Sequence, residues 1–167
     1  MDAGGYVTLR AFYQGKLMGF DLAPASALCS VGQMRRIQRF LDFSGKPTRN
    51  MEVFAGLGRT LLQEAEDVPY AVLDEFGGLE LLVPEFKDQL MTLLSSQVPC
   101  IGVIKTPDAS QALIRRLGLG EDYRFAYEEL SHWLYQDPNT EVLKTTGRYD
   151  DIAREKIRAF KECYVRK

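Results

Sequence analysis

Two short apolar runs constrain the fold of this chain more than any other feature. Residues 70–73 and 98–104 are almost continuously apolar and do not alternate with polar residues, which is typical of strands buried on both faces of a sheet. Between and after them, residues 84–94 and 108–117 show helical spacing, as does the earlier segment 51–66. The strand-helix-strand-helix order predicts an α/β domain with a largely parallel sheet flanked by helices.

The N-terminal part predicts a different element. Residues 5–22 alternate in the manner of strands around a turn at Gly15, so we predict an N-terminal β-hairpin. Residues 23–50 are less regular and fit a short helix or a strand. The later segments are predicted to be an amphipathic helix at 118–138, a last strand at 139–145 and a closing helix at 149–164. We expect residues 1–167 to form a single domain, since this length suffices for one core.

The composition excludes some classes of protein. The 23 acidic and 21 basic residues give a net charge of −2, which argues against a sequence-independent nucleic-acid binder. No apolar stretch approaches the ~20 residues of a membrane span, and the first residues do not resemble a signal peptide. We therefore expect a cytoplasmic protein without a membrane partner. The basic residues Arg10, Arg35, Arg36 and Arg39 either bind an anion or form solvated faces.

The three cysteines are too far apart for a recognisable pairing. Cys29, Cys100 and Cys163 show none of the spacings of a zinc site or a disulfide framework. We expect reduced, mostly buried thiols, as free cysteines usually are.

The acidic pair Asp74-Glu75 directly follows the first apolar run and precedes Phe76, Gly77 and Gly78. Ligands bind at the carboxyl ends of parallel strands, and phosphoryl-transfer enzymes use acids there to hold a metal ion and orient water. Two solvated carboxylates at a strand end are the alternative. The two glycines follow the acids and do not precede a lysine, so a tight turn explains them better than phosphate binding.

Several motifs occur in a fixed order along the chain. They are Gly5-Tyr6-Val7-Thr8, Gly19-Phe20-Asp21, Met51-Glu52-Val53-Phe54, the stretch from Asp74 to Leu81, the run from Pro99 to Val103, and Thr145-Thr146-Gly147-Arg148. The set resembles the thermophile-type nucleoside-triphosphatases, a P-loop family that includes the cancer-related nucleoside-triphosphatases. The most specific element is the stretch from Asp74 to Leu81, which looks like the family's Asp-Glu-Ile-Gly-Lys-Met-Glu-Leu.

The resemblance implies a P-loop NTPase-like fold and a set of roles. Asp74 would be the Walker B ligand of Mg²⁺, and Glu75 would orient or deprotonate the attacking water. Arg148 would approach the nucleotide, although a surface arginine at a helix start explains this residue better. Glu80 is either a partner of the acidic pair or an acid favoured by a helix dipole.

The departures from the family matter as much. The 167 residues contain no Gly-x-x-x-x-Gly-Lys-Ser/Thr loop, whereas in the family a strand and this loop precede the hairpin. The helix at 118–138 has no obvious counterpart and looks inserted, and its aromatic residues either cover the core or present an interface.

Two hypotheses follow from these departures. In the first, the chain hydrolyses NTP, such as ATP or GTP, only when a partner polypeptide or an upstream segment supplies the P-loop. In the second, it is an inactive pseudo-NTPase that serves as an interaction or regulatory module and self-associates through an exposed sheet edge. Phosphoryl transfer to an acceptor, as in a kinase, would use the same acids.

Overall fold

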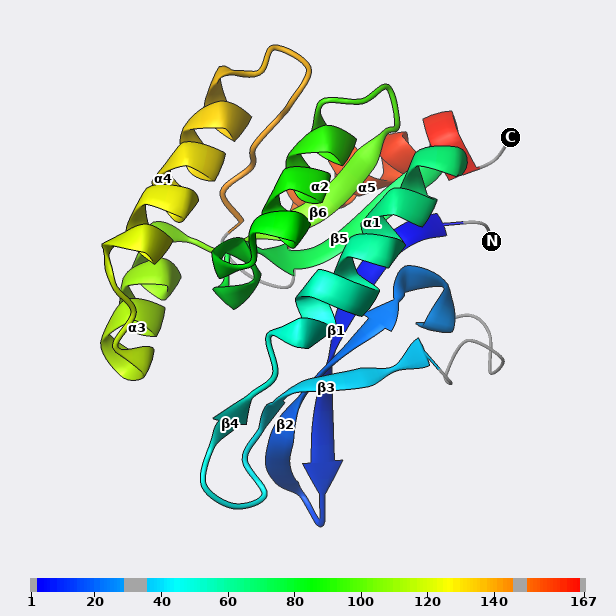
Figure 1. Cartoon of the computed structure of the whole chain (residues 1–167). Helices are drawn as coiled ribbons and strands as arrows, with labels where there is room; N and C mark the ends of the chain where they lie inside the picture. The colour runs from blue at the N-terminus through cyan, green and yellow to red at the C-terminus, as the bar shows by residue number, and fades with distance from the viewer. Residues whose placement is uncertain (1–2, 29–35, 146–149, 166–167) are drawn as a thin grey trace.

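The computed structural model describes residues 3–28, 36–145 and 150–165. A six-stranded sheet runs through the molecule in the order β4-β3-β2-β1-β5-β6 (Figure 1). The strands are β1 (Ala3–Tyr13), β2 (Lys16–Pro24), β3 (Gln38–Asp42), β4 (Thr48–Arg49), β5 (Tyr70–Phe76) and β6 (Cys100–Ile104). The α-helices are α1 (Arg59–Glu64), α2 (Pro84–Leu94), α3 (Pro107–Leu117), α4 (Glu121–Gln136) and α5 (Asp151–Phe160).

The sheet confirms the predicted α/β class but is mixed. Strand β5 pairs in parallel with both β1 and β6, while the pairs β1-β2, β2-β3 and β3-β4 are antiparallel. The parallel part that the sequence predicts is therefore confined to β1, β5 and β6. The irregular segment before residue 51 contributes β3 and β4 to the antiparallel part.

The predicted N-terminal hairpin is confirmed as β1 and β2. Its two-residue turn consists of Gln14 and Gly15, between the paired residues Tyr13 and Lys16. Both turn residues have positive φ, 48° and 77°, as a type I′ turn requires. This turn matches the right-handed twist of the two strands, so the local sequence specifies the pairing.

One face of the sheet carries most of the core. In Figure 1, α1 and α2 lie in front of the sheet and α5 lies behind it. The helical segment that contains α1 includes a π-helical turn at Phe54–Gly58. Its buried side chains pack with those of α2 into the main apolar cluster, which includes Phe54, Leu57, Leu61, Leu62, Phe86, Leu90 and Leu93. Among the described residues, no helix is both long enough and apolar enough to cross a bilayer.

The end of the chain corrects one prediction and confirms another. Residues 139–145 do not form the predicted strand. A strand needs a ladder partner for its backbone groups, and the described residues offer none to this segment. The closing helix predicted at 149–164 is confirmed as α5, which continues as a π-helix at Lys161–Val165.

The cysteines only partly match the expectation of buried thiols. Cys100 is half-buried, and burial raises the pKa of its thiol to about 11. Cys163 is exposed on the π-helix that follows α5, so the prediction is wrong there. Cys29 lies outside the described residues.

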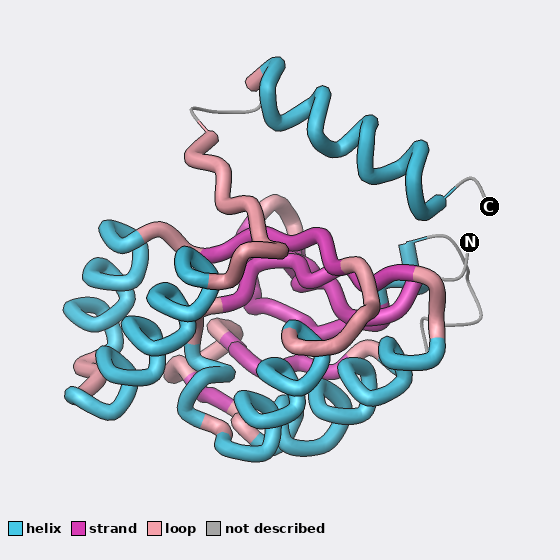
Figure 2. Tube along the Cα trace, turned by 90° about the horizontal axis from the view of Figure 1, so that it is seen from above, coloured by secondary structure: helices cyan, strands magenta, loops and turns pink. Residues whose placement is uncertain are grey.

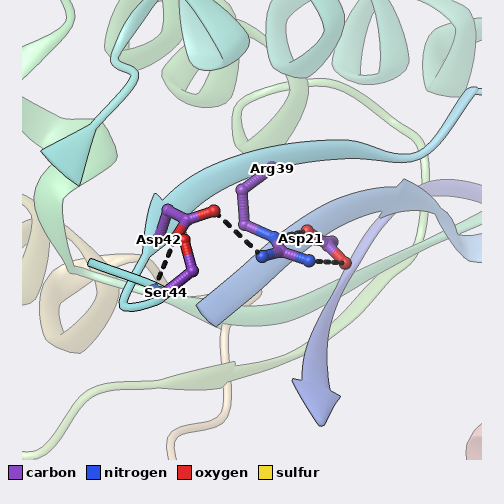
Figure 3. A network of polar contacts seen from close by, with 4 residues as sticks. All are labelled: Asp21, Arg39, Asp42 and Ser44. Atoms are coloured by element: carbon purple, nitrogen blue, oxygen red, sulfur yellow. Dashed lines mark hydrogen bonds and ion pairs between the residues drawn. The ribbon is translucent and has the colours of Figure 1, made fainter. Parts of the chain in front are cut away.

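Two arginines, Arg36 before β3 and Arg39 within it, form ion pairs within the chain. The Arg39 guanidinium donates to Asp21 on β2 and, over 3.3 Å, to Asp42 (Figure 3). The Ser44 hydroxyl and N–H both donate to Asp42 and hold the pKa of that carboxyl below its usual value. Arg36 forms a two-point ion pair with Glu64, at 2.9 and 3.0 Å.

These pairs bear on two of the four basic residues. Arg36 and Arg39 already have carboxylate partners within the chain, which argues against an anion site at either residue. Arg10 is exposed, and Arg35 lies outside the described residues.

Candidate active site

A bulge at the end of β5 sets the position of the acidic pair. Leu73 lies opposite Gly102 of β6, whereas Phe76 lies opposite Ile104. Strand β5 therefore advances three residues while β6 advances two, and the extra residue falls at Asp74-Glu75. Bulges often occur beside active sites, where they redirect a side chain.

Glu75 has an unusual backbone conformation within this bulge. Its φ is +56°, in the left-handed region, which costs roughly 1–3 kcal/mol for a residue other than glycine. The side chain is 48% exposed. Such an outlier persists only where the surrounding structure holds it, and outliers of this kind concentrate at functional sites.

Asp74 is fixed to the neighbouring strand β1. The Thr8 N–H donates to Asp74 Oδ2 over 3.3 Å, and the Thr8 hydroxyl donates to the Asp74 carbonyl oxygen over 3.4 Å. Both residues are half-buried. The parallel register of β1 on β5 brings the hairpin threonine to the acid, which the sequence motifs alone do not show.

Lys105 joins the site from the residue after β6. Its N–H donates to the Phe76 carbonyl over 2.9 Å, and its ammonium group forms an ion pair of 2.5 Å with Glu75 Oε1. The Lys105 side chain is only 15% exposed. Our sequence analysis missed this residue. The sequence did offer a signal for it: Lys105 directly follows the second apolar run. The carboxyl ends of neighbouring parallel strands lie at the same edge of a sheet, so this position is close to Asp74-Glu75.

Glu80 is buried beneath the glycine turn that follows the acidic pair. It is 5% exposed, and its Oε1 accepts a hydrogen bond of 2.7 Å from the Gly78 N–H. Burial raises the pKa of Glu80, while backbone N–H groups, foremost that of Gly78, and the charge of Lys105 oppose this shift. Glu80 contacts the turn and lies near Lys105, but it also lies in the first turn of the 3₁₀-helix Leu79–Leu82, where a helix dipole favours an acid. Both interpretations of Glu80 therefore stay open.

The two glycines allow the chain to turn tightly at this place. Gly77 has φ +91°, and a Cβ on Gly78 would lie 2.8 Å from Glu80 Oε2. These constraints support the interpretation of both residues as turn glycines.

Helix α4 fixes both loops of the site from one side. The Tyr123 hydroxyl donates to the Gly77 carbonyl over 2.9 Å, and the Tyr127 hydroxyl donates to the Lys105 carbonyl over 2.8 Å. The two rings stack with centroids 6.3 Å apart. Tyr123 and Tyr127 therefore cover the core, which is one of the two roles that we considered for the aromatic residues of this helix. Phe125 and Tyr135 do not, because they are 65% and 67% exposed.

The Tyr6 hydroxyl is a buried polar group near the three carboxylates. Tyr6 is 1% exposed, and its Oη has no hydrogen-bond partner among the described residues. Burial raises the pKa of Tyr6, and the negative charges of Glu80, Asp74 and Glu75 raise it further.

We expect Tyr6→Phe to stabilise the fold by about 1–3 kcal/mol, because an unsatisfied buried polar group costs that much. Urea denaturation monitored by circular dichroism would measure the change. Tyr123→Phe is the matched control, since it removes a hydroxyl that does donate, and it should destabilise the fold by about 1 kcal/mol. Equal destabilisation by both variants would show that the Tyr6 hydroxyl has a partner after all.

The structure thus brings three of the four predicted site residues together. Asp74, Glu75 and Glu80 all lie close enough to Tyr6 for their charges to act on it, while Arg148 lies outside the described residues. The described residues contain no group of three or more His, Cys, Asp or Glu side chains suited to a metal ion. Mg²⁺ commonly takes one or two carboxylates together with water and substrate phosphates, so Asp74 fits it as a single protein ligand.

The fold and the site define an α/β domain of the nucleoside-triphosphatase class, with acids at the carboxyl end of a central parallel strand. A family model described as NTPase matches residues 1–127, and the chain belongs to this NTPase family. The matched span ends at Tyr127, within α4. Comparisons with curated proteins and with solved structures give no match.

Proposed function

We propose that this chain supplies the acidic half of an NTP-hydrolysing centre, whose phosphate-binding loop comes from a partner polypeptide or an upstream segment. The observation that carries this proposal is the β5 bulge. It presents Asp74 and Glu75 at the ligand-binding edge of the sheet, with Glu75 in a left-handed conformation that the rest of the fold must maintain. The NTPase family match over residues 1–127 supports the same function.

Each residue of the site has its own role in the proposed hydrolysis. Asp74, held by Thr8, is the carboxylate that would bind Mg²⁺, and the ion neutralises phosphate charge when bound. Glu75 accepts a proton from the attacking water or orients that water. Its partner Lys105 fixes the direction of the carboxylate, and Glu80 holds the turn that follows. Arg148 belongs to the proposal as a nucleotide contact.

Two further features belong to the proposal. Residues 1–167 act as one domain, in which the inserted helix at 118–138 holds the loops of the site through Tyr123 and Tyr127. The location is cytoplasmic, where NTP and Mg²⁺ are available.

One observation favours a second function, that of an inactive pseudo-NTPase with an interaction role. Glu75 is already paired with Lys105, so the carboxylate that would accept a proton from water already has a cationic partner within the chain. Hydrolysis measurements separate the two functions.

The test combines metal binding with hydrolysis. Mn²⁺, used as a paramagnetic stand-in for Mg²⁺, should broaden the NMR signals of Thr8 and Asp74 in the free chain. Asp74→Asn should weaken this binding about tenfold, which equals about 1.4 kcal/mol. Asp67→Asn is the control, because Asp67 is exposed and precedes the opposite end of β5.

Hydrolysis of ATP and GTP with Mg²⁺ is then measured for the chain alone and with a P-loop-bearing polypeptide. We expect phosphate release only in the mixture. Absence of hydrolysis in every mixture, together with equal Mn²⁺ binding by the two asparagine variants, would rule out the proposed centre. Metal binding without hydrolysis would support the pseudo-NTPase.

A further inference from the structure

The net charge of −2 is distributed unevenly along the chain. Residues 1–50 contain seven basic and three acidic residues, a net charge of +4, whereas residues 51–167 contain 14 basic and 20 acidic residues, a net charge of −6. The overall charge argues against a protein that binds nucleic acid with its whole surface, but it does not describe the N-terminal part. A basic region in an acidic chain indicates a local site for a polyanion.

The two acids that the structure describes in this N-terminal part are already neutralised. Asp21 and Asp42 both bind the Arg39 guanidinium. Four other cations of the same part are exposed and form no ion pair with any described residue, namely Arg10, Lys16, Lys46 and Arg49. Arg49 donates to the Leu117 carbonyl over 3.2 Å, which leaves its positive charge uncompensated. The free charges at this end of the sheet are therefore positive.

Strand pairing places two of these cations in one row across the sheet. Arg10 lies opposite Phe20 on β2, and Phe20 lies opposite Leu41 on β3. Leu41 in turn lies opposite Arg49 on β4. Side chains of directly opposed residues project from the same face of a sheet. Because neighbouring strands lie about 4.8 Å apart, the Cα atoms of the two arginines are about 14 Å apart on one face. A strand of a few nucleotides spans this distance, since its phosphates follow one another about every 3.4 Å when stacked.

Two aromatic side chains stand beside this row. Phe12 is 60% exposed and Tyr13 is 65% exposed at the tip of the β1-β2 hairpin. Side chains alternate along a strand, so Phe12 shares the face of Arg10 on β1, while Tyr13 lies opposite Lys16. Proteins bind single-stranded nucleic acid with this combination, because bases stack on the rings while the cations follow the backbone.

This end of the molecule is accessible to a polymer. Figures 1 and 2 show α5 on the face of the sheet opposite α1 and α2, and in Figure 1 the tips of the β1-β2 hairpin and of the β3-β4 connection extend beyond these helices. The Phe43 N–H donates to the Met18 carbonyl, so the connection that carries Lys46 lies beside the hairpin. Residues 44–50 are all exposed.

We propose that this end of the sheet binds single-stranded nucleic acid. Unpaired bases stack on Phe12 and Tyr13, and the phosphates follow the four unpaired cations. The inference does not depend on the proposed NTP hydrolysis. An anionic membrane is the competing partner for exposed rings and cations. The row from Arg10 to Arg49 favours nucleic acid, because it lies on the face of the sheet, where a bilayer at the hairpin tip would not contact it.

The test measures the fluorescence anisotropy of labelled oligothymidylate and oligouridylate of about 12 nucleotides, a length within known site sizes. At about 50 mM salt we expect the full chain to bind both with Kd below about 100 μM. Neither stacking nor phosphate contacts require the ribose hydroxyl. The logarithm of the association constant should fall with the logarithm of salt concentration with a slope of about −3, because each of about four phosphate contacts contributes about 0.7 on a single strand.

Substitutions separate the two kinds of contact. Arg10→Gln and Lys46→Gln should each reduce the steepness of the salt slope by about 0.7, because each removes one phosphate contact. Phe12→Ala and Tyr13→Ala should each weaken binding at least about fivefold, since each removes a stacked base. The two alanine variants should keep the salt slope of the wild type, because stacking releases no counterion.

The matched controls lie on other elements. Lys161→Gln removes an exposed cation after α5, and Phe125→Ala removes a ring that is 65% exposed on α4. Both should bind the oligomers like the wild type. Absence of saturable binding for both oligomers would overturn the proposal, and so would an affinity that both Phe12→Ala and Tyr13→Ala leave unchanged. If the oligomers do not bind but vesicles containing phosphatidylserine do, the proposal is overturned in favour of a membrane.

Discussion

Glu75→Gln is expected to reduce NTP hydrolysis by about 100- to 1000-fold in a mixture that contains the phosphate-binding loop. A positioned general base contributes rate factors of this size. Glutamine has nearly the shape of glutamate and still accepts a hydrogen bond from Lys105, so the bulge should persist, but the amide cannot take a proton from water. The measurement is kcat from phosphate release, alongside the Kd of the nucleotide, which should change little.

The control for this prediction is Glu162→Gln. Glu162 is exposed on the π-helix after α5, and the ring contact of Phe160 with Tyr70 places this region at the amino end of β5. The control should hydrolyse NTP like the wild type. Asp74→Asn should instead raise the Mg²⁺ concentration needed for half-maximal rate. Wild-type kcat in Glu75→Gln would mean that another group activates the water.

The parts of the fold that follow from local sequence were predicted well. The hairpin depends on strand alternation and a two-residue turn, and the strands β5 and β6 are visible as unbroken apolar runs. The predicted burial on both faces is wrong for β6, because it lies at the edge of the sheet and none of its residues is fully buried. The position of Asp74 and Glu75 at the end of β5 follows from the same local pattern. In each case the deciding interactions lie within a few residues of one another.

The features that were missed depend on contacts between distant segments. The pairs Tyr123-Gly77 and Tyr127-Lys105 join residues 46 and 22 positions apart. The bulge arises from the register of β5 on β6, which a single strand does not specify. Residues 139–145 have strand-like composition, but a strand forms only where a partner strand is present.

Gly5→Ala is expected to destabilise the fold by at least about 4 kcal/mol, enough to unfold many domains of marginal stability. Gly5 of β1 lies opposite Val72 of β5 and has φ +84°. A Cβ at this position would lie 2.1 Å from the Val72 carbonyl oxygen, so β1 would have to move away from β5. The free energy of unfolding from urea denaturation would measure the loss.

Gly15→Ala is the matched control, because it separates the backbone conformation from the close approach. Gly15 also has a positive φ, +77°, but nothing lies within 4 Å of the position of an added Cβ. Its substitution should cost only the roughly 1–2 kcal/mol of a left-handed alanine. Equal losses for the two variants would show that β1 can shift without penalty. A larger loss for Gly5→Ala would mean that the contact between β1 and β5, which also brings Thr8 to Asp74, tolerates no added atom.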